Sequence, residues 1–330
     1  MAQMAHQLTF VPATPADAHR LAAHEQRVAD PRLYGPPLDR DACVREIAGN
    51  LLYFVEAEGA LAATAAWRRR DDGSAYLSNI AVDPDFRRRG VARAATLFLL
   101  EEAQACPRVD LVTHPDNAAA IALYRSLGFA AGSLKEDYFG DGEPRVAMLR
   151  DRPIDSPRLR LRPATTSDRT DLHRLEQDPE VMRHLNGGRA TPLEPEAGEK
   201  AGFLMPRGPE VGLWAVMERE TDDLLGWVSL RAEGKVGDLG YRFFRKAWGR
   251  GFATEAAGAV VADGFLRLGL GSIVADTMSV NSLSRAVMER LGMRCVRTFF
   301  ADFPDKLPGS EQGDVEYVLL REEWRGPSRS

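Results

Sequence analysis

Short apolar segments typical of strands alternate along the chain with longer segments whose apolar residues recur at helical spacing. In the first half, apolar runs bounded by turn residues predict strands, and amphipathic runs predict helices. Strands are expected at 7–11, 51–59, 60–67, 75–82 and 110–115 with two more at the end of this half, and helices at 15–29, 39–49, 91–105 and 118–127. This alternation indicates a mixed α/β sheet with helices packed against it.

The second half repeats the same order of elements. Strands are expected at 158–163, 212–218, 224–230, 238–244 and 272–277 and again at the end, and helices begin near 168 and 194 and cover 252–268 and 282–291. The repeated order suggests that the two halves share one fold.

Two pairs of motifs carry this repeat in the residues themselves. FRRRGVARAA at 86–95 corresponds to AWGRGFATEA at 247–256, and NAAAIALYRSLGF at 117–129 corresponds to NSLSRAVMERLGM at 281–293. Both separations are about half of the chain, which is too long for a solenoid repeat and fits a duplicated domain. Because the stretch between the copies is rich in proline, we expect domains at 1–150 and 157–330, joined by a linker at 151–156.

Length and composition limit the class of protein. The chain has 330 residues, 44% of them hydrophobic and 28% charged, which fits about two globular domains. A formal net charge of −5 argues against nucleic acid as a partner, and no apolar run is long enough to cross a membrane. The three cysteines are too few and too scattered for a metal site. Because the first residues lack the pattern of a signal peptide, a cytoplasmic location is expected.

A glycine-rich turn joins the fourth strand of each half to a long helix. In the first half Arg87, Arg88 and Arg89 precede Gly90, and the helix follows directly. The first turn of a helix has unpaired N–H groups and a partial positive charge, so small residues and arginines there suit an anion such as a pyrophosphate. A single copy would favour a plain strand-to-helix turn, but two copies in the same context favour the anion site. Neither copy fits a Walker loop or a dinucleotide fingerprint.

Together these motifs resemble the GNAT family of N-acetyltransferases. Arg87-x-x-Gly90-x-Ala92 is similar to that family's loop [RQ]-x-x-G-x-[GA], and Asn117, Tyr124 and the Leu-Gly-Phe at 127–129 are similar to its second signature. YFGDGEPRVAML at 138–149 resembles the RimI branch, whereas WGRGFATEA, NSLSRAVMERLGM and YVLLREEW resemble the RimJ/RimL branch.

The resemblance implies a fold, a cofactor and a reaction. The fold is α/β, with two tandem GNAT-type domains, each a central mixed, mostly antiparallel sheet flanked by helices. Acetyl-CoA is the implied cofactor, and an amine attacks its thioester directly. The implied cofactor contacts are Ile80, Ala81, Val82, Arg87, Arg88, Arg89, Gly90, Val91, Ala92 and Asn117 in the first half, and Tyr241, Arg242, Phe243, Gly249, Arg250, Gly251, Phe252, Ala253, Thr254 and Asn281 in the second. Both asparagines also suit a plain N-cap.

The resemblance also implies candidate catalytic residues. Tyr124 is the expected proton donor to the leaving sulfur, although its spacing also suits a core position. RimI-like enzymes commonly carry a Glu on the fifth strand, where this chain has Val112, so His114 is the candidate base, or else a surface histidine. In the second half Ser284 is the candidate acid and Asp238 the candidate carboxylate.

The acceptor is left open by the sequence. The loops at 28–38 and 184–196 are rich in proline and glycine and are expected to face the acceptor. An antibiotic amine, an amino acid, a polyamine and a protein N-terminus all remain possible. Because Met288 stands where the first half has Tyr124, an alternative is that one domain is a non-catalytic acyl-CoA-binding or docking module. No nucleic acid, membrane or metal is expected, and the paired domains suggest a monomer.

Overall fold

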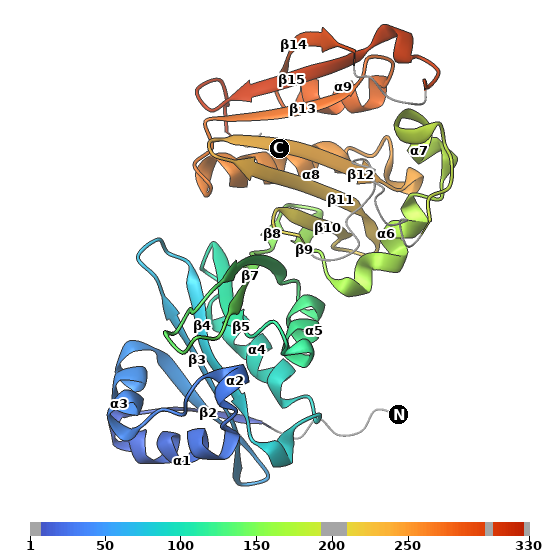
Figure 1. Cartoon of the computed structure of the whole chain (residues 1–330). Coiled ribbons are helices and arrows are strands. Elements are labelled where there is room, and N and C mark those ends of the chain that lie inside the picture. Colours follow the sequence, from blue (N-terminus) through green and yellow to red (C-terminus); the bar gives the residue numbers. More distant parts are fainter. Residues whose placement is uncertain (1–7, 193–209, 301–305, 327–330) are drawn as a thin grey trace. The chain divides into compact units, whose positions relative to one another are not determined.

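The structure, a computed structural model, describes residues 8–192, 210–300 and 306–326 (Figure 1). The chain forms two compact units, Met1–Arg152 and Pro153–Ser330, called unit 1 and unit 2 below. Each unit has its own sheet and its own buried apolar core.

The sheet of unit 1 has the strand order β1-β2-β3-β4-β5-β7-β6. Neighbouring strands are antiparallel except for β4 and β5, which are parallel. The strands are β1 (Thr9–Pro12), β2 (Leu51–Ala57), β3 (Ala60–Arg69), β4 (Ala75–Val82), β5 (Arg108–Thr113), β6 (Ala130–Lys135) and β7 (Arg145–Asp151).

Helices cover both faces of this sheet. They are α1 (Ala18–Val28), α2 (Pro31–Tyr34), α3 (Arg40–Gly49), α4 (Val91–Glu102) and α5 (Ala118–Ser126). On one face Leu99 of α4 packs with Ala65 of β3 in the main core, and on the other Leu21 of α1 and Ile47 of α3 pack with Phe54 of β2. Burying such side chains contributes roughly 1.5–3 kcal/mol each for the large ones, which fixes the helices on the sheet.

Unit 2 repeats this plan. Its sheet has the order β14-β15-β13-β12-β11-β10-β9-β8, in which only the β12–β13 pair is parallel among the described strands. The strands are β8 (Ile154–Asp155), β9 (Leu159–Pro163), β10 (Leu213–Glu218), β11 (Leu224–Glu233), β12 (Val236–Phe243), β13 (Ser272–Met278), β14 (Arg294–Phe299) and β15 (Asp314–Leu320), and the helices are α6 (Arg169–Leu175), α7 (Pro179–Asn186), α8 (Phe252–Leu266) and α9 (Ser282–Arg290).

The core of unit 2 lies between α8 and the sheet. Val260 and Phe265 of α8 are fully buried against Leu230 of β11 and Ile273 of β13.

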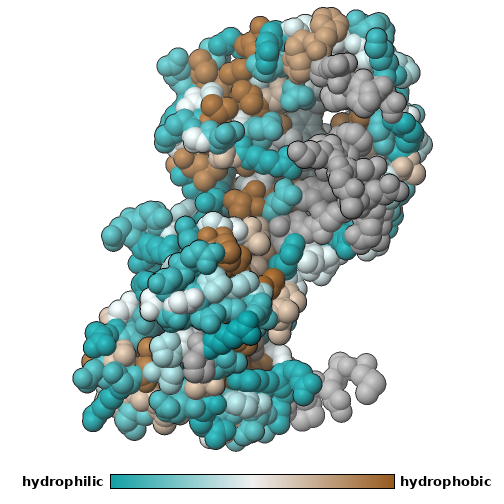
Figure 2. Space-filling view, viewed as in Figure 1, coloured by the Kyte–Doolittle hydropathy of each residue, from teal (hydrophilic) through white to brown (hydrophobic). Residues whose placement is uncertain are grey.

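In the space-filling view, hydrophilic residues cover most of the visible face of unit 1 (Figure 2). None of the helices in the described part of the chain is long and apolar enough to span a membrane.

The fold class expected from the sequence is confirmed, and most expected elements are found within a few residues of their predicted bounds. The prediction of a loop throughout 28–38 was wrong, because α2 lies inside it. The segment expected as a linker contains the last residue of β7 and the whole of β8. Helix α7 was not predicted, and the helix expected near 194 falls outside the described residues.

Candidate active site

In each unit the two parallel strands separate after a short pairing. β4 pairs with β5 only through Ala75 and Tyr76, although β4 continues to Val82. Ser78 has no partner in β3 and forms a bulge, which bends a strand away from its neighbour. In unit 2, β12 pairs with β13 only as far as Asp238. The backbone groups that follow on β4 and β12 are therefore not used by the parallel neighbour.

The predicted cofactor residues of the fourth strands, residues 80–82 and 241–243, lie on these separated segments. Some of their groups are already engaged within unit 1. The carbonyl of Ala81 accepts a hydrogen bond from His24 Nε2 at 3.0 Å, and the carbonyl of Val82 accepts one from Arg87 Nε at 3.3 Å.

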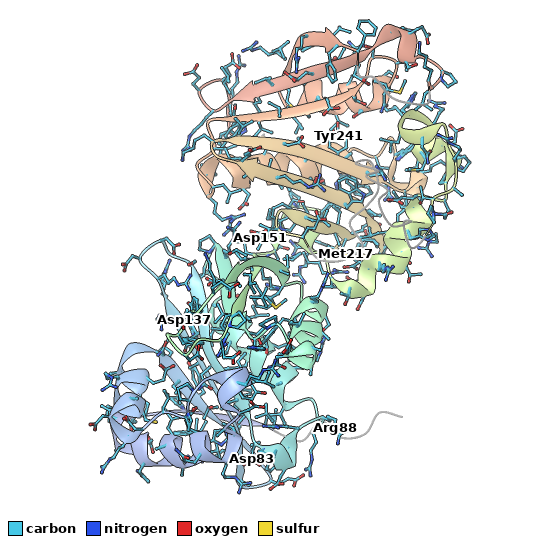
Figure 3. All side chains as sticks on the ribbon, viewed as in Figure 1. Asp83, Arg88, Asp137, Asp151, Met217 and Tyr241 are labelled. Carbon is cyan, nitrogen blue, oxygen red and sulfur yellow. The ribbon has the colours of Figure 1, made fainter. Side chains whose placement is uncertain are left out.

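The glycine-rich turns have the same backbone conformation in both units. Gly90 is the N-cap of α4 with φ of 83°, and Gly251 is the N-cap of α8 with φ of 78°. Two residues earlier, Arg88 and Gly249 are also left-handed, with φ of 61° and 71° (Arg88 is labelled in Figure 3). A side chain at Gly90 would meet no atom within 4 Å. The open backbone at the start of a long helix fits a pyrophosphate group.

The charges around the two turns differ. Among the residues that the structure describes, none of Arg87, Arg88 and Arg89 pairs with a carboxylate. In unit 2, Arg250 donates a hydrogen bond to Glu218 at 2.9 Å. The turn of unit 1 consequently presents more uncompensated positive charge to an anion.

The two predicted asparagines are N-caps. Asn117 accepts a hydrogen bond from the N–H of Ala120 at 3.2 Å at the start of α5, and Asn281 accepts one from the N–H of Ser284 at 3.3 Å at the start of α9. Capping accounts for their position in the helices, and it leaves the amide group of Asn117 available for other contacts.

Tyr124 is a buried residue of α5 and belongs to the main core of unit 1. Its ring lies edge-on to Phe129, with 5.7 Å between the centroids. Burial and the neighbouring Tyr34 raise the pKa of the Tyr124 phenol. Within the described residues its hydroxyl has no hydrogen-bond partner. This phenol therefore stays protonated and can donate a hydrogen bond to a ligand.

His114 is almost fully buried, and both of its ring nitrogens are engaged. Nδ1 accepts a hydrogen bond from the N–H of Asp116 at 3.1 Å. The ring proton therefore lies on Nε2, which donates a hydrogen bond to Glu143 at 3.0 Å. The Glu143 carboxylate is 35% exposed and belongs to the β6–β7 connection. In this arrangement the group with free acceptor capacity is the carboxylate of Glu143.

In unit 2, two hydroxyl groups meet where strand β12 approaches helix α9. Tyr241 donates to the carbonyl of Ser284 at 2.9 Å, and the two hydroxyl oxygens are 3.0 Å apart (Tyr241 is labelled in Figure 3). Met288, which corresponds in sequence to Tyr124, is buried in the core. Ser284 therefore has a phenolic partner that the sequence analysis did not identify.

Asp238 belongs to a group of carboxylates on β12, β13 and β15. Desolvation raises the pKa of Asp238, and desolvation together with the charges of Asp238, Asp314 and Glu316 raises the pKa of Asp276. Asp276 stands the same number of residues before Asn281 as Val112 does before Asn117. The sequence analysis missed Asp276, which the repeat itself could have indicated.

A second carboxylate group, in unit 1, was also missed. Glu25 of α1 accepts a hydrogen bond from the amide of Asn79 at 3.1 Å, and Glu46 of α3 accepts one from the hydroxyl of Ser78 at 3.0 Å. Burial raises the pKa of Glu25, and the charge of Glu46 raises it further. Both glutamates thus reach β4 at its bulge.

Comparisons with known proteins agree with this geometry. Residues 18–129 match the family described as Acetyltransferase (GNAT) family, and residues 158–294 match the one described as Acetyltransferase (GNAT) domain. The chain belongs to the GNAT acetyltransferase family, with one such domain in each half, and it is an acyltransferase. Members of this family generally use acetyl-CoA.

Named relatives include N-acetyltransferases. The FsC-acetyl coenzyme A-N(2)-transacetylase of Aspergillus fumigatus is 33% identical over 186 residues, covering 52% of this chain and 77% of the relative. The [ribosomal protein bS18]-alanine N-acetyltransferase of Salmonella typhimurium is 46% identical over 67 residues, covering 20% of this chain and 45% of that enzyme, so the match spans less than half of it. A solved GNAT acetyltransferase from Bacillus anthracis is 24% identical, with a TM-score of 0.43, 52% of this chain covered and 99% of that chain.

Proposed function

We propose that this chain transfers the acetyl group of acetyl-CoA to a primary amine by direct attack on the thioester, and that unit 1 carries out this reaction with Tyr124 as proton donor. The observation that carries the proposal is that Tyr124 is a buried residue whose hydroxyl has no hydrogen-bond partner among the described residues. It lies in the same core as the strands that separate and the helix that begins at Gly90.

The cofactor is expected to lie with its pyrophosphate on the turn of residues 87–92, supported by the left-handed Gly90, the free N–H groups of the first turn of α4 and the uncompensated arginines. The same role is proposed for residues 249–254 of unit 2. Acetyl-CoA supplies an acetyl group activated as a thioester. The separated segment of β4, together with Asn117 at the start of α5, is proposed to hold its remaining length.

Tyr124 holds a proton at its hydroxyl for the sulfur that leaves as a thiolate. Its raised pKa keeps it protonated at neutral pH, so it acts mainly by donating a hydrogen bond as negative charge develops.

The attacking amine must lose a proton, and His114 with Glu143 is proposed for this task. Because His114 donates from Nε2 to Glu143, the carboxylate is the acceptor of the pair, and the imidazole orients it. Water can carry the proton from the amine to Glu143, whose side chain is partly exposed.

Unit 2 is a second candidate for the same reaction, with Ser284 as acid and Asp238 and Asp276 as the carboxylates that take the proton. The hydrogen-bonded hydroxyls of Ser284 and Tyr241 support this assignment, as does the raised pKa of Asp276. Met288 in place of a tyrosine supports the alternative that unit 2 is a non-catalytic acyl-CoA-binding or docking module.

The acceptor is proposed to be a small amine or a protein N-terminus, the latter by analogy with the named relative that acetylates an alanine of a ribosomal protein. A monomer is proposed because two units of the same fold occur in one chain.

Turnover of two single variants tests the proposal. CoA release is measured with acetyl-CoA and a panel of agmatine, spermidine and a hexapeptide with a free N-terminal alanine, and the N-acetylated hexapeptide is the control without an amine. Tyr124→Phe is expected to lower kcat about 100-fold with little change in the KM for acetyl-CoA, and Ser284→Ala to leave kcat near that of the wild type. Loss of turnover in Ser284→Ala alone would move the reaction to unit 2, and no CoA release with any amine would contradict the proposal.

A further inference from the structure

Glu25 and Glu46 lie together on the face of unit 1 that α1 and α3 cover. Each is half-buried, and each is tied to β4 by one hydrogen bond, to Asn79 and Ser78 respectively. Within the described ranges neither pairs with a lysine or arginine. Two adjacent carboxylates with reduced access to water and no cation between them carry an electrostatic cost that a positively charged ligand would relieve.

The internal repeat identifies the counterpart of Glu25 in unit 2. The short 3-10 turn before α1 and the one before α6 have the same capping box, formed by Thr14 in unit 1 and by Thr165 in unit 2. Glu25 and Glu176 follow these threonines at the same distance along the chain. They therefore occupy corresponding places in the repeat, Glu25 in the last turn of α1 and Glu176 at the C-cap of α6.

In unit 2 this glutamate holds a cation. Arg242 Nη1 donates to Glu176 at 3.3 Å, with Glu176 fully buried and Arg242 nearly so. The guanidinium also lies over the ring of Trp227, 5.4 Å from the centroid. Trp227 and Arg242 are direct partners in the β11–β12 register.

In unit 1 the two partners are small. Thr64 and Ala81 are direct partners in the β3–β4 register, and Ala81 precedes Gly90 by as many residues as Arg242 precedes Gly251. The positions that carry a guanidinium and an indole in unit 2 thus carry a methyl group and a hydroxyl. The hydroxyl of Thr64 donates to Asn79 at 2.8 Å, which orients the Asn79 amide toward Glu25.

We propose that Glu25 and Glu46 form a binding site in unit 1 for the cationic group of the acceptor, an ammonium or guanidinium, at the place that Arg242 fills in unit 2. This inference rests on the proposed function, since it names the class of acceptor. Asn79 directly precedes the β4 segment proposed to hold the cofactor, so a cation at Glu25 lies beside the reacting end. The two units consequently differ in the acceptor that they take.

Calorimetric titration of the full chain with agmatine tests this site, in the presence of CoA so that no acetyl transfer can occur. Agmatine carries both an ammonium and a guanidinium group, the latter being the cation that Arg242 supplies in unit 2. Glu25→Gln keeps the size of the side chain and an oxygen that can accept from Asn79. It is expected to lose one equivalent of agmatine, or to weaken that equivalent at least tenfold. Glu101→Gln, an exposed position on α4, is the matched control and is expected to bind as the wild type does.

The titration separates this site from the proposed reaction. Acetyl-CoA binding is expected to be the same in the wild type and in Glu25→Gln. If the wild type binds agmatine, Glu25→Gln loses an equivalent and no amine is acetylated, then the cation site is retained and the proposed function fails. If Glu25→Gln binds agmatine as the wild type does, or the wild type binds none, the cation site is overturned even where amines are acetylated.

Discussion

Glu176 and Arg242 carry opposite charges in the interior of unit 2, where Glu176 is fully buried and Arg242 nearly so. Breaking a buried pair by removing one partner is costly because the other charge stays buried. We expect Arg242→Leu to lower the free energy of unfolding of unit 2 by about 3–5 kcal/mol, and urea denaturation monitored by tryptophan fluorescence measures this loss.

The pair Arg297–Glu316 in the same unit provides the control, because Arg297 is solvent-exposed and Arg297→Leu is expected to cost far less stability than Arg242→Leu. Adding Glu176→Gln to Arg242→Leu is expected to restore part of the stability, since it removes the buried charge. A loss of stability as small as that of Arg297→Leu would mean that other groups compensate the buried charge of Glu176 when the arginine is absent.

The elements that hold single residues were predictable from the sequence where a local motif carries those residues, whereas their roles stay predictions. Gly90, Asn117 and Tyr124 belong to short spaced motifs, and their elements and conformations agree with what those motifs require. Glu25 and Glu46 could not be found in this way, because only the tertiary fold brings α1 and α3 to the bulge of β4. The sequence does hold one signal for Glu25, because a glutamate follows the threonine of each capping box at the same distance. That signal is visible only after the two halves of the chain have been aligned.

At the scale of elements, the turn before α4 and the turn before α8 share one left-handed conformation although their residues differ. Position 88 of unit 1 is an arginine with φ of 61°, whereas its counterpart Gly249 has φ of 71°. A non-glycine residue in this region costs roughly 1–2 kcal/mol. An arginine at this position is consistent with a favourable electrostatic contribution to anion binding that offsets this conformational cost.

Replacing the capping glycines tests whether each turn binds the cofactor. Gly90→Glu and Gly251→Glu put a carboxylate where a phosphate is expected, so each is predicted to remove one equivalent of acetyl-CoA in a calorimetric titration. Gly59→Glu and Gly234→Glu are matched controls, because these glycines are also left-handed with open space around them and lie in turns remote in sequence from the loops. Their acetyl-CoA binding should be that of the wild type. One site in the wild type, lost in a single variant, would restrict the cofactor to one unit.

Elements with a full apolar pattern were predicted, and very short ones were not. Helix α2 has four residues and β8 has two, too few for either period to be recognised. Helix α7 was missed although Asp178 caps its start and Gly187 its end, because these capping signals flank only eight residues. Its burial depends on Met182 and Asn186, and a buried asparagine does not belong to an apolar stripe.

At the scale of the whole molecule, the duplication gives two folds with separate cores and different site residues. Unit 1 has Tyr124 and the carboxylates of Glu25 and Glu46, for which we propose a cation, whereas unit 2 has Ser284, Tyr241 and an arginine already bound to its glutamate. A copy whose own arginine occupies the acceptor position can keep the cofactor site while changing the acceptor. The positions at which the two copies of the repeat differ are therefore the ones that inform on the acceptor of each unit.

The boundary between the units can be tested with fragments, because each unit has its own sheet and core. Fragments 1–152 and 153–330 are expected to unfold cooperatively on heating, as followed by circular dichroism. A fragment that stops at residue 150 lacks Asp151, whose buried carboxylate accepts a hydrogen bond from Arg108 at 3.0 Å at the end of β7 (Asp151 is labelled in Figure 3). We expect fragment 1–150 to be about 1–3 kcal/mol less stable than fragment 1–152. Asp151→Asn within fragment 1–152 should reproduce most of that loss, whereas equal stability of the two fragments would place the boundary before Asp151.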